Sequence, residues 1–123
     1  MLAALKRAFG GGDSEGNTAF RIVIVVAIIA AVGQVALGGV VRVTDSGLGC
    51  PDWPLCHGRL IPPFELHTLI EYSHRLSAST LGFLVLSATI IVWRAPWRST
   101  FAVSAITGAL ILVVVAAVLG GIT

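Results

Sequence analysis

Long apolar segments separated by short polar stretches dominate the pattern of this chain. Three such segments cover residues 20–43, 67–93 and 100–123. Each reaches the ~20 residues that a helix needs to cross the ~30 Å hydrocarbon layer of a bilayer. A membrane span of this kind is helical because lipid offers backbone groups no hydrogen-bond partners. The pattern therefore predicts an all-α membrane protein, a transmembrane helical bundle with three spans.

Composition supports this prediction. Hydrophobic residues make up 56% of the chain and charged residues only 11%, and the mean hydropathy is +0.95. These values lie well outside the range of soluble domains. The net charge of +2 is too small and too scattered to indicate nucleic acid, so membrane lipid is the expected surrounding.

The placement of basic residues predicts the orientation in the membrane. Residues 1–19 form a polar tail with a short amphipathic turn at residues 2–9, and residues 94–99 form a short turn. The positive-inside rule places both in the cytoplasm and the 44–66 loop outside. We therefore expect a multi-pass protein of the cell inner membrane with a cytoplasmic N-terminus. The basic residues concerned are Lys6, Arg7, Arg21, Arg94 and Arg98.

Cys50 and Cys56 are the only cysteines, and both fall in the loop predicted to lie outside. Two cysteines this close on the oxidising side of a membrane usually form a disulfide. A structural disulfide is the first interpretation. A redox-active pair is the second, because an exposed short-loop disulfide is the labile kind. Metal binding by Cys50, Cys56 and His57 is the third, although thiolate sites usually have tighter spacing.

His67, Glu71 and His74 share one face of the second predicted helix at positions i, i+4 and i+7. An ionisable group in a membrane helix costs about 3 kcal/mol, so such groups usually face the bundle interior and are functional. His74 either bonds to a neighbouring helix or ligates heme iron, while His67 is expected near the interface. Glu71 either pairs with Arg75 at i+4 or handles protons while Arg75 binds a heme propionate.

Other polar and small residues favour helix packing. Residues 36–40 and 118–122 share a Leu-Gly-Gly core, which indicates either close helix packing or a duplicated hairpin. Several polar side chains within the spans are expected to form interhelical hydrogen bonds or to act as small packing residues. These are Gln34, Ser73, Ser77, Ser79 and Thr80.

Three motifs together resemble the first half of the heme A synthase family. They are the run from Gly38 to Gly58 with its Cys-Pro-Asp-Trp-Pro core, the Ile-Pro-Pro at 61–63, and Ile-Glu-Tyr-Ser-His-Arg at 70–75. The resemblance covers about residues 33–80, and residues 119–123 resemble the start of a third-helix motif. Loop cysteines seldom coincide by chance with this core and a Glu-x-x-His helix.

The resemblance implies an oxidoreductase that converts a methyl group of heme O to the formyl group of heme A. Such enzymes have two four-helix halves, each with a histidine pair. His74 then corresponds to a heme-iron ligand and Glu71 to the required carboxylate. Arg75 is the candidate for contact with heme, and Cys50 with Cys56 is the loop pair. Heme O is the substrate on this side, and a heme b cofactor belongs to the second half.

The sequence departs from this family pattern because the fourth helix, its histidine and the second half are not present. We therefore expect a chain that ends early and is inactive alone, completed by further sequence or by a second copy. Heme O synthase and an electron donor are the other expected partners. Two alternatives remain open: a cytochrome b-type electron-transfer subunit, and a thiol–disulfide oxidoreductase that uses the loop cysteines.

Overall fold

Three long helices make up the computed structural model, which describes residues 14–122. They are α2 (Ser14–Val43), α3 (Leu66–Arg94) and α4 (Thr100–Ile122). Within the described residues, β pairing is limited to one isolated bridge between Cys56 and Arg59. By length and composition each helix can cross a membrane. The prediction of an all-α, multi-pass membrane protein is confirmed.

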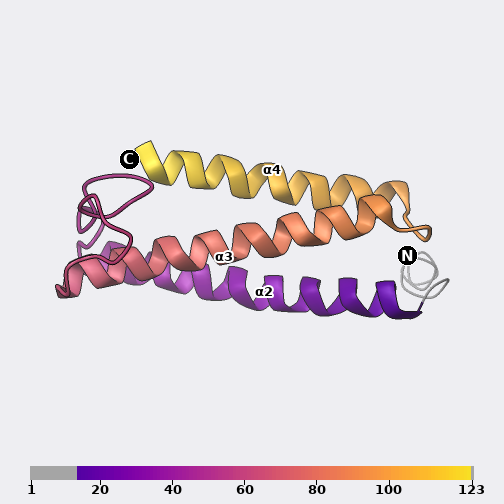
Figure 1. The fold of residues 1–123 in the computed structure, drawn as a ribbon, viewed down its shortest axis with the longest axis horizontal. Helices are drawn as coiled ribbons and strands as arrows, with labels where there is room; N and C mark the ends of the chain where they lie inside the picture. The colour runs from indigo at the N-terminus through magenta and orange to yellow at the C-terminus, as the bar shows by residue number, and fades with distance from the viewer. Residues whose placement is uncertain (1–13, 123) are drawn as a thin grey trace.

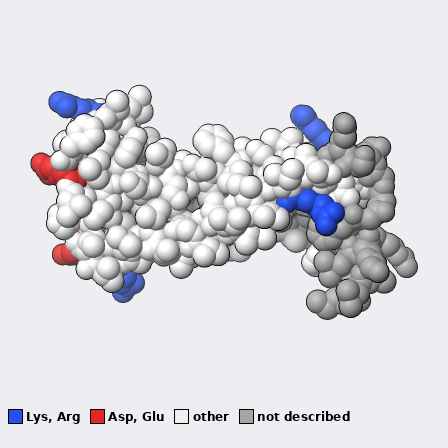
Figure 2. Space-filling view, turned by 90° about the horizontal axis from the view of Figure 1, so that it is seen from below, with Lys and Arg blue, Asp and Glu red and all other residues white. Residues whose placement is uncertain are grey.

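The helices form a flat row in which α3 lies between α2 and α4 (Figure 1). The 44–65 loop and the C-terminal end of α4 lie at one end of the bundle, and the 95–99 turn lies at the other. On the face seen in Figure 2, acidic side chains gather at the loop end, whereas only basic ones are seen at the turn end. The predicted tail residues Lys6 and Arg7, with the amphipathic turn at 2–9, lie outside the described residues.

Within the described residues, helix α2 begins at Ser14, six residues before the membrane span predicted to start at residue 20. Residues 14–19 contain no proline, so the helix can continue through them although Gly16 disfavours it. Trp97 of the 95–99 turn packs near this first part. Its ring centroid lies 5.3 Å from that of Phe20, and a Cβ on Gly16 would lie 3.7 Å from the Trp97 Nε1. The contact with Trp97 thus stabilises the polar first turns of α2.

The other boundaries lie close to those expected. Helix α3 extends one residue beyond residues 67–93 at each end, and α4 begins at residue 100. The buried apolar core lies toward the turn end of the bundle and includes small residues that bring the helices close together. Its buried members are Phe20, Ala27, Val85, Ala88, Val92 and Ile106. The loop end is instead held together by polar contacts.

Candidate functional site

Glu71 and Arg75 form an ion pair on α3, with 2.8 Å between Arg75 Nε and Glu71 Oε1. Their i, i+4 spacing places both side chains on one face of the helix. Glu71 is buried, with 7% of its surface exposed. Of the two interpretations of this carboxylate, the structure forms the ion pair.

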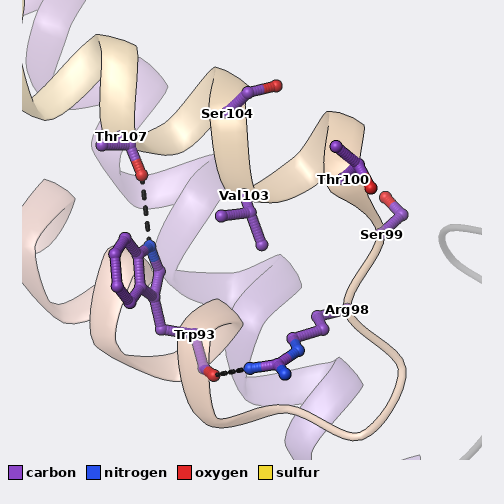
Figure 3. Close-up of a pocket in the computed structure, with 7 residues that line it drawn as sticks. All are labelled: Trp93, Arg98, Ser99, Thr100, Val103, Ser104 and Thr107. Carbon is purple, nitrogen blue, oxygen red and sulfur yellow. Dashed lines mark hydrogen bonds between the residues drawn. The ribbon is translucent and has the colours of Figure 1, made fainter.

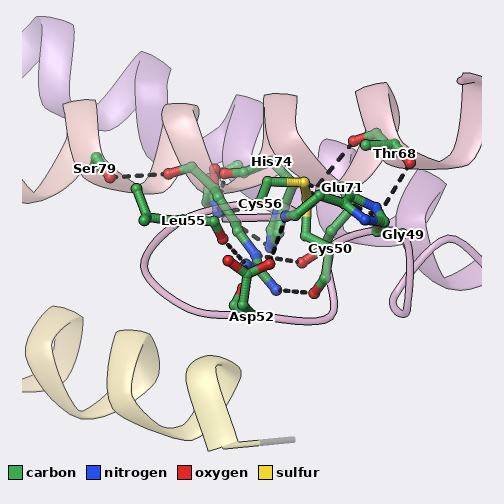
Figure 4. Close-up of polar contacts among 12 residues, drawn as sticks. Gly49, Cys50, Asp52, Leu55, Cys56, Thr68, Glu71, His74 and Ser79 are labelled. Atoms are coloured by element: carbon green, nitrogen blue, oxygen red, sulfur yellow. Dashed lines mark hydrogen bonds and ion pairs between the residues drawn. A yellow bond between two sulfur atoms is a disulfide. The ribbon is translucent and has the colours of Figure 1, made fainter. Parts of the chain in front are cut away.

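The Arg75 guanidinium also binds the loop. Nη2 donates to the Cys50 carbonyl oxygen at 2.9 Å, and Nη1 donates to the Leu55 oxygen at 3.1 Å and to the Asp52 oxygen. Figure 4 shows these contacts beside α3. Each terminal nitrogen of the guanidinium is therefore bonded to backbone of a loop some 20 residues away in sequence. A contact between Arg75 and a heme propionate would have to replace one of these acceptors.

His74 faces α2. The Gln34 amide nitrogen lies 3.1 Å from His74 Nδ1, 3.3 Å from Nε2 and 3.3 Å from the His74 carbonyl oxygen. The imidazole also fits against Gly38, where an added Cβ would lie 3.4 Å from His74 Cε1. The interhelical hydrogen bond predicted as one role of His74 is present. The second Gln34 polar atom, Oε1, is buried without a hydrogen-bond partner.

Cys50 and Cys56 are joined by a disulfide and are 3% and 0% exposed. Burial protects a disulfide from attacking thiolates and so favours the structural interpretation. Because both sulfurs are bonded to each other, the predicted metal site with His57 is not formed. No group of three potential metal-ligating side chains occurs within residues 14–122.

Asp52 lies inside the disulfide ring, which we define as residues 50–56, and closes a tight turn. Its carboxylate accepts hydrogen bonds from the backbone N–H groups of Gly58, at 2.8 Å, and His57. His57 and Gly58 both have positive φ, 53° and 67°, as a two-residue type I′ turn requires. The pKa of Asp52 is lowered, and the hydrogen bond from Gly58 is the largest cause. Desolvation acts in the opposite direction but is the smaller effect.

Gly49 lets the loop approach the start of α3 closely. A Cβ at this position would lie 2.5 Å from the His67 carbonyl oxygen. The Gly49 oxygen accepts a hydrogen bond from Thr68 Oγ1 at 3.1 Å. Nearby, His67 Nδ1 lies 3.0 Å from Ser46 Oγ, and His67 is exposed. Sequence patterns predicted no role for Gly49 or Asp52. The glycine at position 58 was the one local sign of a turn.

Some expected polar contacts take another form. Ser79 and Thr80 donate to the carbonyl oxygens of residues 75 and 76 in their own helix, at 3.0 Å each. Of the two roles expected for these residues, the hydroxyls of Ser79 and Thr80 do not form the interhelical bond but bond within α3. The reason is that a Ser or Thr hydroxyl readily reaches the i−4 carbonyl of a helix. Gln34 does bond across helices, as predicted.

The two Leu-Gly-Gly segments contact different aromatic rings. Gly38 lies against His74, and a Cβ on Gly121 would lie 3.2 Å from two carbons of the Trp53 indole. Trp53 belongs to the disulfide ring, so this contact joins the loop to the end of α4. Both segments thus use a small residue for close packing.

Two surface hollows lie at the opposite end of the bundle from Glu71 and His74. The larger, about 520 Å³, lies between Trp93 and the first turns of α4 (Figure 3). Trp93 Nε1 donates to Thr107 Oγ1 at 3.1 Å there. The second, about 450 Å³, adjoins Trp93 and Arg94. Neither includes a predicted site residue.

The described residues do not bring together the two histidines that would hold a heme b between them. An imidazole is a suitable iron ligand, and His74 is the one histidine between helices. The other two lie against the loop, where His57 Nε2 is 3.0 Å from the Gly49 oxygen and His67 contacts Ser46. A histidine pair facing one macrocycle is therefore not assembled by residues 14–122.

Comparison with known proteins gives a consistent family over the first part of the chain. Residues 21–67 match the COX15-CtaA family model, described as cytochrome oxidase assembly protein. This match ends four residues before Glu71. No solved structure matches the chain.

Three curated relatives that resemble this chain are each named "Heme A synthase". The chain is 52% identical over 56 residues to "Heme A synthase" of Exiguobacterium sp. strain AT1b, covering 44% of this chain and 19% of the relative. It is 38% identical over 79 residues to that of Bacillus licheniformis (63% and 26%), and 42% identical over 73 residues to that of Lysinibacillus sphaericus (55% and 24%). These matches span about a quarter or less of each relative. The N-terminal part of this chain is similar to the heme A synthase family.

Proposed function

We propose that this chain forms the substrate side of a heme A synthase, which oxidises a methyl group of heme O to the formyl group of heme A. The observation that carries the proposal is the adjacency of Glu71 and His74 on α3 beneath the disulfide loop. Relatives of this chain are named for heme A synthesis, and a buried carboxylate beside an inward-facing imidazole suits that chemistry.

The proposed roles follow from where the side chains lie. The His74 imidazole would hold the iron of heme O. Glu71, one helical turn away, would accept protons released from the methyl carbon. The overall change, R–CH3 + H2O → R–CHO + 4 H⁺ + 4 e⁻, releases four protons and four electrons, so a nearby base and a redox partner are both needed. Arg75 would contact a propionate only after exchanging one of its loop acceptors.

The rest of the enzyme is also a proposal, since the matched segments are about a quarter or less of each relative. A fourth helix with the partner histidine, and the heme b cofactor, would come from outside the described residues or from a second copy. Heme b would supply electron transfer. Because the overall change releases four electrons, an electron acceptor replaces the electron donor expected from the sequence, and heme O synthase is the other proposed partner. We expect the 123-residue chain alone to be inactive.

We propose the cell inner membrane as the location, with a cytoplasmic N-terminus. The turn end of the helices carries the basic residues Arg21, Arg94 and Arg98. At the loop end, basic residues are balanced by the acidic residues Asp45, Asp52 and Glu65. This asymmetry supports a cytoplasmic turn end and an outer 44–65 loop.

Glu71→Gln in a complete, membrane-reconstituted enzyme tests the proposed function. Conversion of heme O to heme A, measured by chromatography of extracted hemes, should fall about 100-fold or more because a general base is lost. The heme absorption spectrum should persist. Glu65→Gln, at the exposed carboxylate before α3, is the matched control and should keep full conversion.

The same experiment separates the alternatives. Unchanged heme A formation in Glu71→Gln would contradict the proposed role of this carboxylate. Reversible heme reduction without heme A formation in the unmodified enzyme would indicate a cytochrome b-type subunit instead.

A further inference from the structure

We infer that Arg75 is a positioning residue that holds the disulfide ring over Glu71, so that the ring covers this carboxylate on the loop side. The guanidinium donates hydrogen bonds to three backbone carbonyl groups of the ring. The contacts with the loop stand independently of heme chemistry, and the consequence for Glu71 rests on the proposed function.

The carbonyl groups of the disulfide ring converge on one side chain. Those of Cys50, Asp52 and Leu55 all accept hydrogen bonds from Arg75. A seven-residue ring has few donors of its own, because Pro51 and Pro54 lack an N–H group. A buried carbonyl group without a donor is costly, and the bonds from Arg75 to the Cys50 and Asp52 oxygens are partly buried, while the bond to the Leu55 oxygen is exposed. An external donor with several N–H groups therefore meets a specific need of this ring.

Arginine suits this task better than lysine. Its planar guanidinium carries five N–H donors in a fixed arrangement, while a lysine ammonium has three on a flexible stem. Here Arg75 Nε donates a hydrogen bond to the Glu71 carboxylate, and Nη1 and Nη2 donate to carbonyl oxygens of the ring. The side chain is 20% exposed and that of Glu71 is 9% exposed. A charge with so little water contact needs these partners.

Arg75 makes the innermost of a row of loop contacts along α3. Thr68 Oγ1 donates to Gly49 O near the start of the helix, and Tyr72 OH donates to Leu60 O at 2.7 Å. These two residues bind segments that flank the ring. Arg75 lies one turn further along and binds the ring itself. Loss of Arg75 should therefore release the ring while the flanking segments stay attached.

The consequence concerns access to Glu71. While the ring is held, Glu71 is paired with Arg75 and buried. Release of the ring would remove both the cover and the constraint on Arg75. In the proposed enzyme, Arg75 thereby keeps the outer aqueous phase away from the carboxylate that handles protons.

The rate of disulfide reduction measures whether the ring is held. The full chain in membranes is treated with a water-soluble phosphine. The Cys50–Cys56 disulfide oxidises the phosphine and is itself reduced to two thiols, while water supplies the oxygen of the phosphine oxide and the two thiol protons. The thiols are then labelled with a maleimide and counted by mass. In Arg75→Ala the reduction rate should rise at least about tenfold, because charge-assisted hydrogen bonds are lost. Arg59→Ala, at an exposed cation of the same loop, should leave the rate unchanged.

Chemical rescue distinguishes this role from a general effect on folding. Added ethylguanidinium should slow reduction in Arg75→Ala toward the original rate, whereas ethylammonium should not, because only the former reproduces the fork of donors. In Glu71→Gln, where the ring carbonyl contacts remain, the rate should stay within about twofold of the original.

Three results would overturn the inference. They are an unchanged rate in Arg75→Ala, an equal acceleration in Arg59→Ala, and the absence of rescue by ethylguanidinium. If Arg75→Ala does not insert into membranes, Arg75→Lys replaces it, and a reduction rate equal to the original would then contradict the need for a guanidinium. None of these readouts requires heme, so failure of the proposed function leaves the outcome readable.

Discussion

The Gln34 amide on α2 contacts both ring nitrogens of His74 on α3, at 3.1 Å from Nδ1 and 3.3 Å from Nε2. The two nitrogens lie on either side of Cε1, and their in-plane axes diverge. An amide nitrogen near both cannot lie along both axes. At least one ring nitrogen therefore keeps an in-plane direction without an aligned donor. Helix α2 therefore orients the imidazole through the Gln34 amide and the close approach of Gly38.

Gln34→Leu is expected to destabilise the α2–α3 pair. Hydrogen bonds between membrane helices contribute about 0.6 to 2 kcal/mol, and the Gln34–His74 contact joins residues 40 positions apart. Reversible unfolding in mixed micelles measures the loss in free energy of unfolding. Val35→Leu, at an exposed neighbouring position, is the control. Equal stability of Gln34→Leu and the original protein would contradict the prediction.

Gly49→Ala should prevent the loop from resting on α3. The new Cβ would lie 2.5 Å from the His67 carbonyl oxygen and 2.9 Å from the Thr68 nitrogen, both backbone atoms that cannot turn aside. Overpacking of this kind costs about 1–3 kcal/mol. Thermal unfolding should show a lowered midpoint.

Gly39→Ala serves as the matched control for that measurement. Its Cβ would meet nothing within 4 Å, and alanine is favoured over glycine within a helix by up to about 1 kcal/mol. The midpoint should stay the same or rise. A similar loss in both variants would show that the close approach at Gly49 is not the cause.

The turn around Asp52 should depend on pH. The folded pKa of this carboxyl is lowered from 3.8, first by the hydrogen bond from Gly58 N–H. A lowered folded pKa stabilises the turn fully above about pH 3.8, and this contribution is lost as pH falls through the folded pKa. Hydrogen exchange at Gly58, corrected for intrinsic rates, should accelerate in that range. Asp52→Asn should lack this pH dependence.

Gly121→Ala should displace Trp53 from the end of α4. The added Cβ would lie 3.2–3.3 Å from three indole atoms, so the ring must shift by a few tenths of an ångström. Indole fluorescence, taken as the difference from the same variant with Trp53→Phe, should move to longer wavelength as exposure increases. Gly108→Ala, whose Cβ would find nothing within 4 Å, should leave the emission unchanged.

Local spacing predicted the contacts that one element makes with itself. The i, i+4 separation of Glu71 and Arg75 gave their ion pair, and the short separation of the two cysteines gave the disulfide. The partners of hydroxyl groups were harder to predict. The Ser79 hydroxyl can donate to another helix or to a carbonyl oxygen of its own helix, and sequence spacing allows both. The acceptors of Arg75 in the ring were not predicted, since they are backbone atoms and carry no signal in residue type.

The sequence by itself determined three apolar helices, because backbone groups in lipid must bond within their own segment and about 20 apolar residues suffice to cross. It also determined which polar residues share a face of α3. Only the tertiary structure decided that His74 faces Gln34, that Gly49 meets α3, and that Arg75 binds the disulfide ring. These relationships depend on the rotation and spacing of neighbouring helices and on the path of the loop, which arise from packing of the whole bundle.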